Sequence, residues 1–390
     1  MISCSACFGQ MNVFLDYSNF ETRLSELASS AGVDNFSAAE VTSIRAGIKT
    51  NLETMFSQFD GISFTESDPG GARPELLFGL EGGGLGVADH IDFLNVAIQD
   101  TARVFTAQFG FVVDEFSGGN NRSDQLSQLT AALSGTAAHE LGHNLGLRHH
   151  DAHGDLTYEG TPVNTNGVED TRIMATGSTG LSEAGREVIR DFSVNSLVKL
   201  AYANQTLLSG NPQAANEVGD AGDTIADAQV VDFETIPVAN RFGEVIIGSI
   251  DSNNDVDLYE VQLAANSVFT IDVNNDVIAT TFFRNFDNEI ALLDDQGNVL
   301  YSSTDTFYST TQFGAGDGRD FDGVLYNVNI FDQGTYYVRI NSQGGSSFGD
   351  YRVLMHSNLL AATIPEPSSA LFCLSALSCI LGRRRRNPTA

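Results

Sequence analysis

Residues 139 to 149 read His-Glu-Leu-Gly-His-Asn-Leu-Gly-Leu-Arg-His, and this stretch decides how the chain around it must fold. His139 and His143 are four residues apart, so on a helix they project from one face, one turn above the other. Two imidazoles at this spacing can bind one zinc ion at about 2.0–2.1 Å each. Gly146 would end the helix in a sharp turn, because glycine adopts positive φ at little cost. That turn would bring His149 back as a third ligand.

This set of three ligands is compatible with a catalytic metal ion. Three protein ligands leave a fourth position open for water, which is typical of a catalytic zinc and not of a structural one. Glu140 stands beside the first ligand and could serve as general base toward that water. A His-rich surface helix without metal is the alternative, but it does not explain Glu140 and Gly146 at the required offsets. We therefore predict zinc on His139, His143 and His149, with Glu140 as the catalytic residue.

A second motif follows in the order that such a site requires. Thr171-Arg-Ile-Met-Ala-Thr-Gly177 places Met174 twenty-five residues after His149. Together the two motifs resemble the metzincin zinc metallopeptidases, whose Met-turn methionine lies beneath the zinc-bound histidines. The resemblance covers roughly residues 11–205 and implies an α+β catalytic domain that hydrolyses peptide bonds. An ordinary core methionine is the alternative interpretation of Met174.

The chain departs from the better-known metzincins at two positions, so no subfamily is assigned. His150 follows the third ligand, where related families carry other residues. Thr176 stands two residues after Met174, where some subfamilies have a tyrosine that assists the zinc. His150 and His153 could be spare ligands or a transition-state donor, but we expect them to be solvated loop residues.

Composition points away from nucleic acid. Among 390 residues, 50 are acidic and 20 are Lys or Arg, a formal net charge of −30. Such a surface repels phosphate backbones and suits an exported protein in saline or calcium-bearing surroundings. Acidic loops can also hold Ca²⁺ through carboxylate and carbonyl oxygens. No EF-hand spacing is present, so a calcium site is only a secondary expectation.

The C-terminal end of the chain suggests export, whereas Met1 to Met11 lacks the basic n-region of a leader and has only a brief apolar run. Residues 1–10 are interpreted as an N-terminal segment, a possible leader remnant, and Cys4 and Cys7 within them are weak evidence for a metal site. At the other end, Pro365-Glu-Pro367 precedes an apolar stretch and then Arg383 to Arg386. This tail, residues 365–390, resembles the PEP-CTERM sorting signal of Gram-negative bacteria. The resemblance implies recognition by an exosortase-type enzyme and transient membrane contact through the C-terminal segment.

A permanent membrane span is a poorer interpretation of that tail. The apolar stretch of residues 368–382 would make a helix of roughly 22 Å, shorter than the ~30 Å hydrocarbon core. A plain tail anchor would still leave the body of the protein outside the cytoplasm. The remaining cysteines, Cys373 and Cys379, also lie in this tail, so the body of the chain contains no disulfides.

Periodicity predicts the elements of the catalytic region, residues 11–205. A Ser37 to Glu40 capping box opens a helix, and Leu85 to Asp89 could be the metzincin edge strand that pairs with extended substrate, or a plain exposed loop. The expected strands are 12–17, 62–66 and 111–113, and the expected helices are 37–59, 92–109, 127–145 and 183–203.

After a linker at 206–217 the pattern becomes that of strands. Alternating segments separated by Asp, Gly and Asn turns predict an all-β sandwich over residues 218–357. The expected strands are 243–250, 257–263, 267–273, 289–293, 299–301, 326–330, 334–340 and 351–355. Segments such as Asp255-Val-Asp-Leu-Tyr259 resemble the bacterial pre-peptidase C-terminal domain, a module appended to secreted peptidases.

These observations predict an exported zinc-dependent endopeptidase at the cell surface or in the bacterial envelope, acting on protein or peptide substrates. One alternative is an inactive metzincin-like extracellular binding or matrix protein. Another is an intracellular zinc peptidase whose tail matches the sorting signal by chance.

Overall fold

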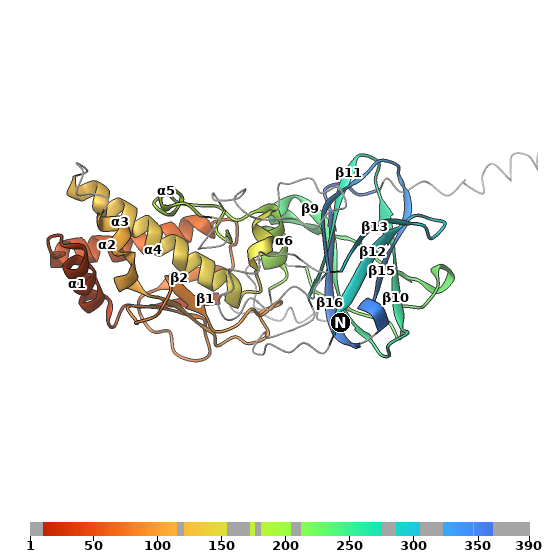
Figure 1. Cartoon of the computed structure of the whole chain (residues 1–390), viewed down its shortest axis with the longest axis horizontal. Coiled ribbons are helices and arrows are strands. Elements are labelled where there is room, and N and C mark those ends of the chain that lie inside the picture. The colour runs from red at the N-terminus through yellow and green to blue at the C-terminus, as the bar shows by residue number, and fades with distance from the viewer. Residues whose placement is uncertain are drawn as a thin grey trace, which may run out of the picture.

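A computed structural model describes residues 11–114, 121–153, 172–175, 181–203, 212–274, 286–304, 323–345 and 347–361. Residues 1–10 and the tail 365–390 lie outside these ranges, and so do the four cysteines. The described chain folds into an α+β part followed by a part made mainly of strands (Figure 1). Within the described ranges, no helix combines the length and the apolarity needed to cross a membrane.

The α+β part is built on a five-stranded sheet with the order β2-β1-β3-β5-β4. Its strands are β1 Met11–Asp16, β2 Ile62–Thr65, β3 Glu75–Phe78, β4 Gly86–Ala88 and β5 Thr101–Val104. Four of them run parallel, whereas β4 is antiparallel to β5 and lies at the edge. Buried and exposed residues alternate along β1, as a sheet with one covered face requires.

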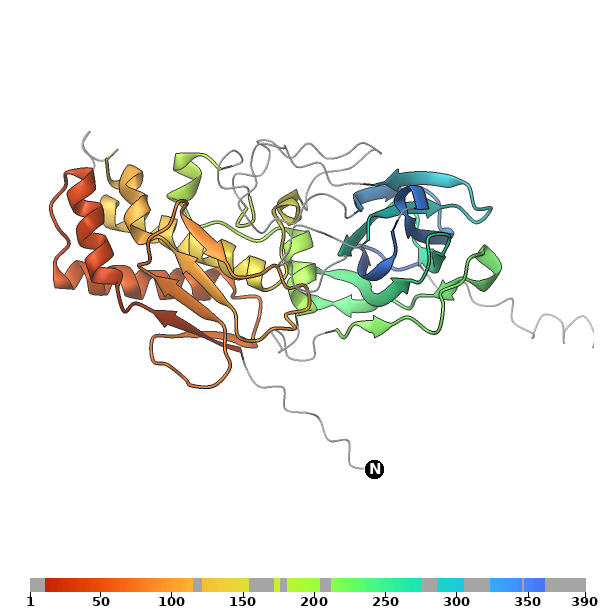
Figure 2. The same ribbon diagram turned by 60° about the horizontal axis from the view of Figure 1, so that its bottom comes forward.

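Helices pack against this sheet and against one another (Figure 2). They are α1 Phe20–Ala31, α2 Ala38–Met55, α3 Gly110–Asp114, α4 Arg122–Asn144, α5 Glu183–Arg186 and α6 Val194–Ala201. The expected capping box is confirmed, because Ser37 and Glu40 each accept a hydrogen bond from the other's backbone N–H. The buried residues of α2 recur every three or four positions, so one apolar stripe faces the core.

The second part is a β-sandwich. One sheet has the order β13-β12-β15-β10-β7 and the other β14-β11-β16-β9-β6, with β8 paired to β9. The strands are β6 Ala215–Asn216, β7 Gln229–Val230, β8 Glu234–Ile236, β9 Arg241–Ile250, β10 Val256–Leu263, β11 Ser267–Asn274, β12 Asn288–Leu293, β13 Val299–Ser303, β14 Val324–Ile330, β15 Gly334–Ser342 and β16 Gly349–Ser357. Every strand expected from alternation is present. β6, which pairs with β9, falls within the expected linker.

The apolar core of the α+β part extends to the β-sandwich, which also has buried clusters of its own. Ile236, Val245 and Leu354 of the β-sandwich belong to the same buried cluster as the helices of the α+β part. α6 lies between the two parts (Figure 1), and it is buried from Asn195 to Ala201. At this boundary His356 Nε2 lies 3.0 Å from Asn195 Oδ1. Burial lowers the pKa of His356 to about 3, so this histidine is neutral.

Three expectations for the α+β part are wrong. Residues 92–109 are not a helix, because Leu94 and Asn95 have positive φ and residues 101–104 form β5. Residues 111–113 belong to the short helix α3 and not to a strand. The expected helix 183–203 is two helices, α5 and α6. It is interrupted where Asp191 forms a β-bridge with Arg172, which demands extended backbone.

Candidate metal centre

The expected helix and turn around the three histidines are present. α4 carries His139 and His143 on successive turns, and it ends at Asn144, one residue before the expected end. Gly146 then adopts φ +94°, and a Cβ there would lie 2.5 Å from the backbone Cα of Phe93. Only glycine fits such a conformation at such a contact. The chain returns in a 3-10 helix, η3 His149–His153, which begins with the third histidine.

The three imidazoles converge on one point. His139 Nε2 lies 3.2 Å from His143 Nε2 and 3.2 Å from His149 Nε2. Nitrogen atoms bound to one tetrahedral zinc at 2.0–2.1 Å would be roughly 3.3 Å apart. The three side chains thus form a group that could hold a metal ion.

Hydrogen bonds on the far side of two rings orient their Nε2 atoms. His139 Nδ1 lies 2.7 Å from the carbonyl oxygen of Ile173, and His143 Nδ1 lies 2.8 Å from that of Leu147. A carbonyl only accepts, so each Nδ1 donates and each Nε2 presents a lone pair. Burial, and then the neighbouring imidazoles, lower the pKa of His139 well below its usual value. The Nε2 lone pairs therefore stay unprotonated and point toward one another. Such an arrangement suits the binding of a metal cation.

Met174 lies beside the helix that carries His139 and His143. Its side chain is fully buried, and a Cβ on Gly142 of α4 would lie 2.7 Å from its sulfur atom. The thioether therefore packs against the helix that carries both histidines. The preceding residue, Ile173, supplies the carbonyl that orients His139. Residues 171 and 176–177 of the expected motif lie outside the described ranges.

Glu140 is buried beside the imidazoles. Burial raises the pKa of its carboxyl to about 8, against the opposing effects of His149 and of a hydrogen bond from the Ala88 backbone. A divalent cation in the group would lower this pKa again, because positive charge favours the carboxylate. A Cβ on Gly86 would lie 2.6 Å from Glu140 Oε1, so the carboxylate lies directly against β4.

Residues 85–89, which could have been an edge strand or an exposed loop, contain an edge strand of the sheet. β4 occupies residues 86–88 of the expected 85–89 and pairs with β5 on one side only among the described strands. Its other edge carries the backbone groups of Gly86 and Ala88, of which the Ala88 N–H already donates to Glu140. A further extended chain could pair with the remaining groups of this edge. The same strand contacts Glu140, so an added chain would run beside the candidate metal centre.

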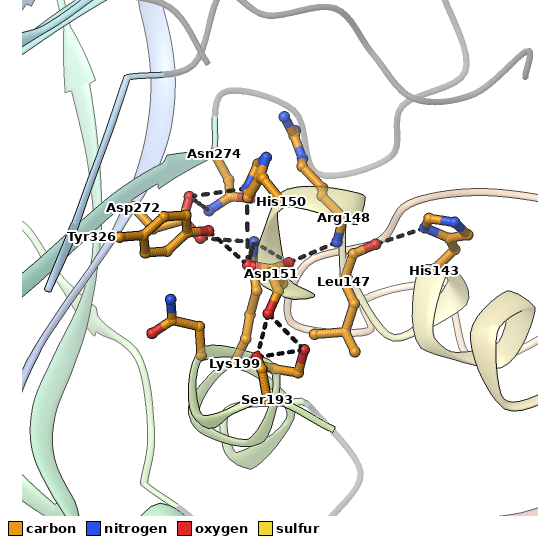
Figure 3. Close-up of polar contacts among 12 residues, drawn as sticks. His143, Leu147, Arg148, His150, Asp151, Ser193, Lys199, Asp272, Asn274 and Tyr326 are labelled. Atoms are coloured by element: carbon orange, nitrogen blue, oxygen red, sulfur yellow. Dashed lines mark hydrogen bonds and ion pairs between the residues drawn. The ribbon is translucent and has the colours of Figure 1, made fainter. Parts of the chain in front are cut away.

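The expectation that His150 is a solvated loop residue is wrong. His150 is 4% exposed and its ring lies 5.9 Å from the Tyr326 ring of the β-sandwich. Its Nε2 lies 3.8 Å from Asp151 Oδ1 and 3.9 Å from Asp272 Oδ1, and Figure 3 shows it well apart from His143. η3 lies at the boundary between the two parts, which a sequence pattern cannot reveal. The side chain of His153 lies outside what the structure describes.

Sequence reasoning missed a group of charged side chains beside η3. Asp151, Lys199, Asp272 and Tyr326 come from four distant segments and are all buried (Figure 3). Lys199 Nζ lies 3.2 Å from Asp151 Oδ2 and 2.9 Å from Asp272 Oδ2. Only Asp151, adjacent to the histidine motif, had any local signal.

A second group could hold a cation in the β-sandwich. Glu217, Asp220 and Asp257 each offer one carboxylate oxygen, and these atoms lie within 4.8 Å of one another. Oxygen ligands of this kind suit Ca²⁺. This is the place in the described structure where the expected calcium site is best tested, and the identity of any ion is open.

No protein-family profile matches the sequence, and no curated protein is significantly similar to it. Solved structures give partial likenesses. PliG of Aeromonas hydrophila, a periplasmic inhibitor of g-type lysozyme, is 11% identical, with 33% of this chain and 92% of that chain covered and a TM-score of 0.21. PliG of Salmonella Typhimurium is 14% identical, with 37% and 99% covered and a TM-score of 0.19.

The pre-peptidase C-terminal domain of a collagenase from Bacillus anthracis is a further neighbour. It is 16% identical, with 30% of this chain and 88% of that chain covered, and the TM-score is 0.18. At such low TM-scores these likenesses define neither the family nor the activity of the chain. The candidate metal centre must therefore be judged on its own geometry.

Proposed function

We propose that the protein is an exported zinc endopeptidase of the metzincin type. The observation that carries the proposal is the convergence of three imidazole Nε2 atoms, each 3.2 Å from the next along the group, with the Glu140 carboxylate beside them. A zinc ion bound there would polarise a peptide carbonyl and lower the pKa of water to about 7. Three histidines and one free position are the donor set that such chemistry requires.

Glu140 is the proton carrier in this proposal. It is buried, so a proton that it takes from water is held and not lost to solvent. The Ala88 N–H, which donates to it, anchors it against β4. From that position Glu140 passes the proton to the amine that leaves when the peptide bond breaks.

The edge strand supports a peptide as substrate. An extended chain added beside β4 would form backbone hydrogen bonds with the groups of its outer edge that Glu140 does not use, without regard to its own side chains. Its carbonyl groups would then lie beside Glu140, which β4 contacts. This arrangement favours cleavage within a chain over removal of a terminal residue.

Export is supported by features outside the centre. The net charge of −30 suits a secreted protein. The segments resembling a pre-peptidase C-terminal domain and the tail at 365–390 point to the cell envelope. Fractionation of cells should place the protein in the envelope or medium, with its last ~25 residues absent by mass spectrometry. An intact protein in the cytoplasm would contradict this part of the proposal.

Replacement of Glu140 by Gln tests the chemistry. The variant should bind zinc as the native protein does and lose at least about 100-fold in casein or gelatin cleavage, because no side chain then carries the proton. Glu53→Gln, on the solvent side of α2, is the matched control and should cleave normally. A chelator should abolish cleavage, and added zinc should restore it.

The outcomes separate the alternatives. Zinc bound at His139, His143 and His149 without any cleavage would favour the inactive binding or matrix protein. His143→Ala should remove the metal, which elemental analysis of the purified protein measures. Equal cleavage by the native protein and Glu140→Gln would end the proposal.

A further inference from the structure

The loop that carries the third imidazole is held from three directions. Asp151, two residues after His149, is fully buried, and its Oδ2 accepts from the Arg148 N–H at 2.6 Å. Its backbone carbonyl accepts hydrogen bonds from the hydroxyls of Ser193 and Ser196, at the start of α6. These bonds fix η3 to itself and to α6.

The third direction is the β-sandwich. Tyr326 of β14 donates from its hydroxyl to Asp151 Oδ1 at 3.1 Å. Asp272 of β11 accepts from Lys199 at 2.9 Å, and the same ammonium lies 3.2 Å from Asp151 Oδ2. Lys199 therefore bridges the loop of the α+β part to a strand that lies more than one hundred residues later in sequence (Figure 3).

We propose that Asp272 and Tyr326 of the β-sandwich position the His149 loop, so that the metal centre is complete only when the C-terminal part is docked. They are positioning residues, because they act on His149 through Asp151 and Lys199. The proposal rests on the metal-binding part of the proposed function. It makes the β-sandwich a component of the centre and not an appended module.

The strength of these contacts follows from burial. Lys199, Asp151 and Asp272 have side chains that are 0%, 1% and 2% exposed, so water screens them little. Removal of one member of such a group leaves a charge buried without compensation, which forces the surrounding loop to move. The loop concerned starts at a metal-ligand candidate.

A second metal ion could in principle occupy this group, because His150, Asp151 and Asp272 also lie within 4.8 Å of one another. The Lys199 ammonium already lies between the two carboxylates, at the place that a cation would take. A divalent ion there would meet a positive charge at close range. The group is therefore better explained as an ammonium-centred link between the two parts.

Two substitutions in the full-length protein test the proposal. Tyr326→Phe removes only the hydroxyl that contacts Asp151, and Asp272→Asn removes only the charge that Lys199 binds. Loss of groups that orient a metal ligand typically costs 10–100-fold in metal affinity, and we expect about 10-fold for Tyr326→Phe. Titration of zinc against a chromophoric chelator measures this change.

Tyr351→Phe is the matched control. Tyr351 is as buried as Tyr326, and its hydroxyl donates to a buried carboxylate, that of Asp257, but inside the β-sandwich. It should lower stability about as much as Tyr326→Phe and leave zinc affinity unchanged. The visible spectrum of the cobalt-substituted protein should change with Tyr326→Phe and not with Tyr351→Phe, which a purely structural role would not predict.

Amide hydrogen exchange makes the test independent of metal. In metal-free protein, residues 148–153 should exchange faster in Tyr326→Phe and Asp272→Asn than in the native protein or Tyr351→Phe. Native protein that binds no zinc would refute the proposed function, whereas unchanged exchange would refute the positioning role. Zinc affinity that is equal in all four proteins would also overturn this inference.

Discussion

At the scale of single residues, three glycines shape the metal centre as much as the histidines do. A Cβ on Gly86 would meet Glu140, one on Gly142 would meet Met174, and one on Gly146 would meet the backbone of Phe93. The first two let a strand and a methionine approach α4 closely. The third also needs positive φ, which L side chains adopt only with strain.

Gly146→Ala should therefore destabilise the protein and disturb the third ligand. The strained φ alone costs roughly 1–3 kcal/mol, and the contact with backbone adds to it. Chemical denaturation measures the loss in unfolding free energy. Gly83→Ala is the control, because Gly83 is exposed with open space around its Cβ position, and it should change the free energy little. Equal stability of the two variants would contradict this account of the turn.

The positions of some single residues could be predicted from the local sequence pattern. Spacing alone placed His139, His143 and His149 together, because an α-helix and one glycine turn are local structures. It failed for His150, whose burial depends on strands of the β-sandwich. Local sequence carries no information about what packs on a loop from far along the chain.

At the scale of elements, α6 is the piece that joins the two parts. It was expected as the end of one long helix, but its residues are buried against both the α+β part and the β-sandwich. Its lysine, Lys199, would ordinarily be exposed. Here it is fully buried between Asp151 and Asp272, so α6 contributes a charged link to the boundary between the two parts.

Lys199→Met should reveal what this link contributes. The substitution keeps the length and apolar stem of the side chain and leaves two buried carboxylates without their cation. Breaking a buried ion pair in this way typically costs about 3–5 kcal/mol, which thermal or chemical unfolding would detect. Lys49→Met is the control, because Lys49 forms a partly exposed pair with Glu53 on α2. Its loss should cost no more than about 0.5 kcal/mol.

A loss of less than about 1 kcal/mol in Lys199→Met would mean that the two carboxylates are relieved in some other way, for instance by taking up a proton. Such a result would also weaken the proposed coupling between the β-sandwich and η3.

At the scale of the whole molecule, the stability of the fold depends on the pH through a buried carboxyl group. Burial raises the pKa of the Asp257 carboxyl. The hydrogen bond that it accepts from Tyr351 lowers this pKa, and the negative charge of the nearby Glu217 raises it further. The folded protein thus holds this proton more tightly than the unfolded chain. The resulting stabilisation is complete below the pKa of an unfolded aspartate, about 3.9, and is lost as the pH rises through the folded value.

We therefore expect Asp257 to make the unfolding free energy fall as the pH is raised from about 5 to the alkaline side of neutrality. Buried neutral His356 acts in the opposite sense over the lower part of this range, because its pKa is lowered on folding. Asp257→Asn should flatten this dependence, whereas Asp332→Asn, at an exposed position, should not. Thermal unfolding over a series of buffers measures both. The same pH dependence in the native protein and in Asp257→Asn would contradict the expectation. If Ca²⁺ binds the same group, it should restore stability at the higher pH by mass action.

The sequence by itself determined the elements whose cause is local. The histidine helix and its glycine turn, the capping box of α2 and the strands of the β-sandwich all follow from spacing, propensity and alternation. Tertiary structure alone decided the rest: that residues 101–104 join a parallel sheet, that Asp191 interrupts a helix by bridging to Arg172, and that Lys199 is buried against Asp272. The physical reason is that these outcomes depend on contacts between segments far apart in the chain. Their free energy outweighs local preference and leaves no periodic trace in the sequence.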